Sequence, residues 1–107
     1  MFGSFFNTAE VDKYADWIVG EVKRYLPPGF DLSTRNMAER AEHLNERIAK
    51  RTVEFTQKSR LNIYKKAHLA ARVREGMSAN GYPESYVKSF SFDLLTRIQV
   101  ASNQRTR

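Results

Sequence analysis

The chain has 107 residues, of which 18 are basic and 12 acidic, so its formal net charge is +6 at pH 7. It contains no cysteine, which excludes disulfides and thiolate metal sites. No apolar run approaches the roughly 18 residues that a membrane-spanning helix needs, so we expect no membrane span. With 41% hydrophobic and 28% charged residues, the composition is ordinary for a folded protein, and we expect residues 1–107 to form a single domain.

Residues 1–6 form a short apolar segment that carries Phe2, Phe5 and Phe6. The segment lacks the basic region and the long apolar region of a signal peptide, so we expect a cytoplasmic protein. Because exposed apolar patches are unfavourable, packing of this segment on the core is the preferred interpretation. The alternative is a docking peptide or an anchor on a membrane surface, with these phenylalanines in contact.

The first predicted helix follows Asn7, which is a good N-cap, and Glu10 completes a capping-box pattern. Apolar residues then recur every three or four positions and form one face. Trp17 lies on the flank of that face, and we consider it a candidate docking aromatic together with the three N-terminal phenylalanines. A Pro-Pro-Gly sequence at 27–29 ends the helix.

Residues 34–75 contain neither proline nor glycine and consist mostly of good helix formers. With Ser33 as N-cap, they predict one long helix, about 63 Å in length at 1.5 Å per residue. The apolar residues change face near residues 56–60, so the two halves pack on different neighbours, or the helix bends or breaks there. Because no glycine or proline marks a turn, we favour a continuous or mildly kinked helix.

An Asn-Gly pair at 80–81 is a strong turn signal, and Pro83 suits the first position of a last helix. Apolar spacing extends this helix to about Ala101, and the polar residues 102–107 are expected to fray. The expected fold is all-α: a long central helix, with the first helix on its first half and the last helix on its second. The alternative is a break near Ser59 and a compact four-helix bundle.

The sequence contains no nucleophile elbow, phosphate-binding glycine loop or zinc-protease motif, so we expect no enzyme, catalytic residue or cofactor. One group of side chains shares a side of the central helix in the way that metal ligands must: Glu39, Glu42, His43 and Glu46. A di-metal site in a bundle needs matching ligands on a second helix, and neither flanking helix contains histidine. We therefore expect no metal site, but a solvated face with Arg40 and Arg47 as local partners.

Positive charge is concentrated at residues 47–74, where nine basic residues accompany one acidic residue, while residues 1–46 have a net charge of −3. Four cations spaced seven residues apart drift only about 20° per step along a continuous helix. With one further arginine they form what we call the basic row: Arg47, Arg51, Lys58, Lys65 and Arg72. The structural alternative is that the acidic first segment neutralises these cations within the molecule or between subunits.

The basic row and the thin core of a three-helix monomer favour a non-enzymatic interaction or assembly module. It would present a basic helix face to an acidic protein partner or to a second copy of itself. The alternative is nucleic-acid binding through phosphate contacts, although base stacking has weak support, with Tyr64 as the aromatic residue beside these cations. We interpret His68 as a packed core or interface histidine, with a pH sensor as the alternative.

Overall fold

The computed structural model describes residues 8–105, with side chains for residues 8–103. Within that range the chain forms four helices and no strand, which confirms the all-α class. The helices are α2 (Ala9–Tyr25), α3 (Arg35–Lys58), α4 (Ile63–Ala79) and α5 (Glu84–Arg105). The predictions made for Phe2, Phe5 and Phe6 concern residues outside the described range.

The predicted continuous central helix is wrong, because residues 59–62 separate α3 from α4. Ser59 leaves helical geometry, with φ −111° and ψ 135°. Asn62 then caps α4: its Oδ1 atom accepts a hydrogen bond of 2.8 Å from the backbone N–H of Lys65. Asparagine is among the strongest N-cap residues, so this helix starts without a proline or glycine before it. The four-helix alternative therefore describes the fold.

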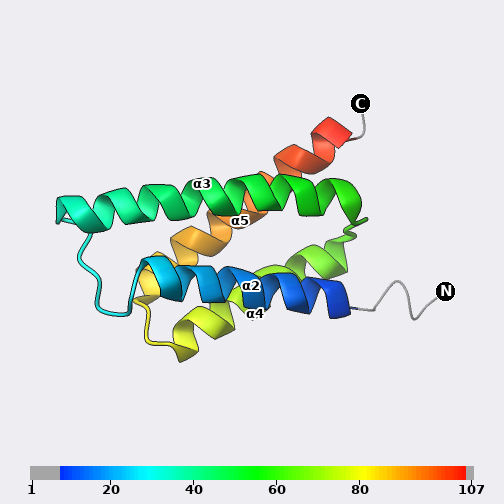
Figure 1. Cartoon of the computed structure of the whole chain (residues 1–107). Helices are drawn as coiled ribbons and strands as arrows, with labels where there is room; N and C mark the ends of the chain where they lie inside the picture. The colour runs from blue at the N-terminus through cyan, green and yellow to red at the C-terminus, as the bar shows by residue number, and fades with distance from the viewer. Residues whose placement is uncertain (1–7, 106–107) are drawn as a thin grey trace.

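The order of packing also differs from the expected one. α2 packs mainly on α4 and α3 packs mainly on α5, with further contacts between α4 and α5 and between α2 and α3. Figure 1 shows α2 and α3 running antiparallel in front of α4 and α5. The first helix therefore covers chiefly the second half of the 34–75 segment, and the last helix packs on both halves. The break makes this possible, since the chain changes direction between the halves.

The core receives aliphatic side chains from all four helices. Its most deeply buried members include Ile18, Val22, Leu26, Leu44, Leu69, Val73, Met77, Leu94 and Ile98. Burying an aliphatic side chain of this size stabilises the fold by about 1.5–3 kcal/mol. The change of apolar face in the sequence is explained here, because α3 and α4 each turn their own face toward this one core.

Both predicted turns are present, and each uses a glycine in the left-handed region. Gly29 has φ 84° and Gly81 has φ 87°, values that side chains with a Cβ disfavour. α4 continues through Gly76 to Ala79, and the Nδ2 atom of Asn80 donates a hydrogen bond to the Gly76 carbonyl at 2.7 Å. α4 thus extends four residues beyond residue 75, where the expected central helix ended, and the connection to α5 spans residues 80–83.

Three helix ends differ from their predicted positions. Thr34, and not Ser33, caps α3, since its Oγ1 atom accepts the backbone N–H of Met37 at 3.2 Å. Thr8 occupies the N-cap position of α2, where its hydroxyl donates to Oδ2 of Asp12 at 3.2 Å. α5 runs to Arg105, beyond the predicted end near residue 101.

Candidate functional site

The break divides the basic row between two helices that do not continue one another. Arg47, Arg51 and Lys58 belong to α3, whereas Lys65 and Arg72 belong to α4. The seven-residue spacing therefore does not produce one straight line of charge, because that geometry requires a continuous helix. The role of each cation depends on its own surroundings.

Arg47 and Arg72 are paired with carboxylates of α2. The Nε atom of Arg47 donates to Oε1 of Glu21 at 2.7 Å, and Glu21 is only 7% exposed. The Nε atom of Arg72 donates to Oδ1 of Asp16 at 3.3 Å, and its Nη1 atom lies 3.6 Å from Oδ1 of Asp12. These hydrogen bonds and charges raise the pKa of both guanidinium groups. The acidic first segment therefore neutralises part of the basic row within the molecule.

Arg51 and Trp17 contact each other. The Arg51 guanidinium carbon lies 5.1 Å from the centroid of the Trp17 ring, and its Nη1 atom lies 3.7 Å from Oε1 of Glu54. Trp17 is half-buried and stacks on Tyr14 at 5.8 Å, and Tyr14 stacks on Phe55 at 4.3 Å. The candidate docking aromatic Trp17 thus belongs to a cation–π and stacking group that extends from Arg51 at the surface to the buried ring of Tyr14.

The remaining cations of the row lie beside the connection between α3 and α4, together with two that the row did not include. We call this cluster the basic end: Lys58, Arg60, Lys65 and Lys66. None of the four forms an ion pair with a carboxylate of residues 8–103. Sequence reasoning missed Arg60 and Lys66 because they fall off the seven-residue spacing of a continuous helix.

Two hydrophobic side chains project from the first turn of α4, within the basic end. Ile63 is 85% exposed and Tyr64 is 45% exposed. Among the described large hydrophobic residues, Ile63 has the highest exposed fraction. Leaving apolar surface in water costs about 25 cal/mol per Å², so a partner that covers Ile63 gains that free energy. The basic end therefore combines unneutralised charge with an apolar anchor.

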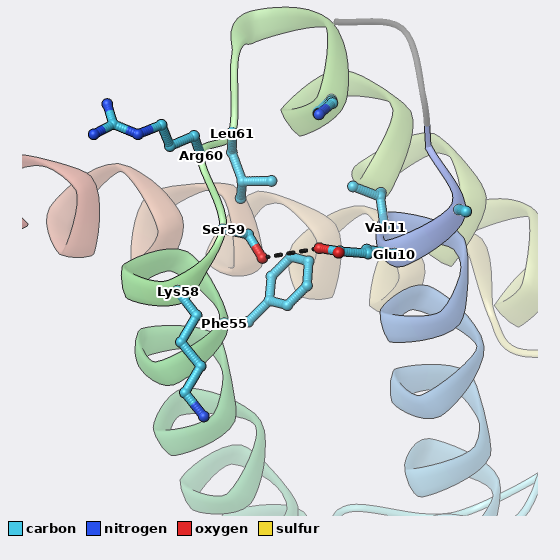
Figure 2. Close-up of a pocket in the computed structure, with 9 residues that line it drawn as sticks. Glu10, Val11, Phe55, Lys58, Ser59, Arg60 and Leu61 are labelled. Atoms are coloured by element: carbon cyan, nitrogen blue, oxygen red, sulfur yellow. Dashed lines mark hydrogen bonds between the residues drawn. The ribbon is translucent and has the colours of Figure 1, made fainter. Parts of the chain in front are cut away.

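A pocket of about 460 Å³ lies beside the basic end, between the start of α2, the end of α3 and the connection (Figure 2). Its wall is partly apolar, with Val11, Phe55 and Leu61. The Oγ atom of Ser59 lies 3.4 Å from Oε2 of Glu10, to which it donates. In Figure 2, the side chains of Lys58 and Arg60 extend away from this hydrogen bond. The lining thus combines one carboxylate and three cations with an apolar wall.

His68 joins α4 to α2 at the helix interface. Its Nε2 atom lies 2.7 Å from Oδ1 of Asp12, and the two side chains are 32% and 30% exposed. This hydrogen bond is the main reason that the pKa of Asp12 lies below its ordinary value, with Arg72 and Thr8 adding to the effect. His68 is therefore a half-exposed interface residue, held by a carboxylate.

The acidic face of α3 is arranged differently from its prediction. Glu39 pairs with Arg35 at 3.1 Å, whereas Arg40 donates to the backbone carbonyls of Tyr25 and Arg24 at 2.7 and 3.0 Å. The predicted local partners Arg40 and Arg47 thus bind other groups. Glu42, His43 and Glu46 are exposed, and nowhere in residues 8–103 do three His, Asp or Glu side chains meet as metal ligands.

These features define a protein whose described residues form four helices, with a basic end whose four cations have no ion pair among those residues. Comparisons of the chain with protein-family models, with curated proteins and with solved structures found no match. In the described part of the chain, no helix has the length and apolar character needed to cross a membrane.

Proposed function

We propose that the protein is a non-enzymatic interaction module, which binds an acidic protein partner through the basic end and Ile63. One observation carries the proposal: all four cations of the basic end lack a carboxylate partner among residues 8–103, whereas Arg47 and Arg72 have one. An external carboxylate that approaches these cations has no internal competitor to displace. Such charge complementarity accelerates association and selects the partner.

The exposed Ile63 favours a protein partner over nucleic acid. Interface hot spots are desolvated residues, surrounded by contacts that exclude water. An acidic surface with an apolar depression would neutralise the cations and cover Ile63, which is 85% exposed, in the same contact. A phosphate backbone would neutralise the cations and leave Ile63 in water.

Nucleic-acid binding is the second candidate, and Tyr64 supports it. Tyr64 is 45% exposed beside four cations, and its ring, whose centroid lies 6.2 Å from that of the stacked His68 ring, is the candidate surface for a base. Four phosphate contacts on duplex DNA predict a log–log salt dependence with a slope of about −3.6. Absence of binding at low salt would eliminate this candidate.

Self-association is the third form of the proposal, with a second copy as the partner. α5 exposes Phe92 at 69% and Val100 at 51%, and these provide apolar surface outside the basic end. Light scattering at tens of micromolar protein is expected to show a dimer in this case. A strictly monomeric species would leave the acidic protein as the partner.

The decisive experiment is affinity purification of the tagged chain from its source cells, with and without nuclease. The wild type is compared with Lys58→Glu/Lys65→Glu and with Ile63→Asp. The matched control is Lys13→Glu/Lys23→Glu, which reverses two exposed cations of α2 that also lack an ion pair with a described residue.

The proposal predicts a nuclease-resistant partner that both basic-end variants lose and the control keeps. Loss of the partner on nuclease treatment would instead support nucleic-acid binding. Equal loss in the control variant would contradict the proposal, because the contact would then depend on net charge and not on the basic end.

A further inference from the structure

A second pocket, of about 500 Å³, lies on the other side of the α3–α4 connection. It is formed by the end of α3, the start of α4 and the last turns of α5. The two pockets share Ser59, Arg60 and Leu61, so the connection separates them. The volume falls within the range of roughly 300–1,000 Å³ that is typical of small-molecule sites.

The lining of this pocket is suited to an anion. Arg60 and Lys66 supply two positive charges, and the described lining residues include no carboxylate, whereas those of the first pocket include Glu10. Neither cation forms an ion pair with a residue of the described chain. Arg60 lines both pockets, and in Figure 2 its side chain points away from the hydrogen bond between Ser59 and Glu10.

Neutral donors from α5 complete the lining. Ser102 carries a hydroxyl group, and the Nε2 atom of Gln99 has two N–H groups, one of which is bonded to Oδ1 of Asn103 at 3.1 Å. The remaining amide hydrogen and the hydroxyl are thus available beside the two cations. Leu61 provides an apolar surface next to these polar groups.

We propose that this pocket binds a small molecule that carries a phosphate monoester. A phosphate dianion matches the two cations in charge, and its three terminal oxygens accept several hydrogen bonds at once. A guanidinium group such as that of Arg60 binds two of these oxygens in a fork, and an ammonium group such as that of Lys66 binds as a point charge. The organic part then occupies the rest of the volume, against Leu61.

This site shares Arg60 and Lys66 with the basic end, whereas Lys58, Lys65 and Ile63 belong to the proposed protein contact alone. The test follows the amide resonances of the full ¹⁵N-labelled chain during titration with inorganic phosphate, AMP and O-phosphoserine at constant ionic strength. We expect saturable shifts at Arg60, Lys66 and Ser102, and tighter binding of at least one monoester than of inorganic phosphate. Monoesters no tighter than inorganic phosphate would overturn the assignment to a phosphorylated molecule.

The variant Arg60→Gln/Lys66→Gln should weaken monoester binding by at least about tenfold, because it removes both charge-assisted contacts. The control Lys13→Gln/Lys23→Gln lowers the net charge equally and should bind like the wild type. Equal weakening in both variants, or no saturable shift in the wild type, overturns the site. The variant Lys58→Glu/Lys65→Glu separates the two proposals, since it should lose the protein partner and keep the pocket's shifts.

Discussion

The Oη atom of Tyr14 lies 2.6 Å from the Oγ1 atom of Thr52, in a buried hydrogen bond that joins α2 to α3. Thr52 has no exposed surface and Tyr14 is 5% exposed. Burying a hydroxyl group destabilises the folded state unless the group forms a hydrogen bond, and here each hydroxyl is the hydrogen-bond partner of the other. The bond therefore fixes how α2 lies against α3, next to the stacked ring of Phe55.

Replacing Tyr14 with phenylalanine should leave the Thr52 hydroxyl without this partner and lower the free energy of unfolding by about 1–3 kcal/mol. The double variant Tyr14→Phe/Thr52→Val removes both polar groups and should recover part of the loss. Urea denaturation of the wild type and the two variants measures the difference in the free energy of unfolding. A double variant no more stable than Tyr14→Phe alone would contradict this view of the bond.

Burial of two phenol groups makes the stability depend on alkaline pH. Desolvation raises the pKa of Tyr14 and of Tyr86 to about 12, from an ordinary value of 10.0. Because these pKa values are raised in the folded state, their contribution to stability is complete below pH 10 and declines as the pH rises toward 12. Denaturation at a series of pH values should show this decline, and Tyr14→Phe/Tyr86→Phe should largely remove it.

Substitution by alanine should have opposite effects on stability at two glycines that lie inside helices. A Cβ atom on Gly76 would lie 2.8 Å from Cγ2 of Val19, so Gly76→Ala forces α2 and α4 apart and should destabilise the protein. Gly20 has open space around it, and Gly20→Ala should stabilise the protein by about 0.5–1 kcal/mol. Thermal denaturation measures the change in stability of each variant. If the clash with Val19 destabilises Gly76→Ala, adding Val19→Ala should restore part of the lost stability.

The cap at Asn62 should stabilise the start of α4. Asn62→Ala removes the bond from Oδ1 to the backbone N–H of Lys65 and should lower the free energy of unfolding by about 0.5–2 kcal/mol. Asn62→Asp keeps an oxygen at that position and should retain most of the stability. If Asn62→Ala matched the wild type in urea denaturation, another interaction would have to hold the break in place.

The sequence alone determined the local structure of this protein. Periodic apolar residues predicted the helices on either side of the 34–75 segment, and the glycines at 29 and 81 marked both turns. The apolar face also changed near residues 56–60, where the chain does break. Periodicity and turn chemistry depend on neighbours a few residues apart, which is why they can be read directly.

Only the tertiary structure decided where the 34–75 segment breaks and which of its cations form ion pairs. A helix can continue through Ser59 and Asn62 at small cost, so their residue types alone do not end it. The chain breaks there because two separate helices can place Leu44 and Leu69 in one core, and Asn62 then serves as an N-cap. Arg47 pairs with Glu21, 26 residues away, whereas the basic end has no such partner among the described residues. Ion pairs between distant residues arise from packing, and no spacing in the sequence specifies them.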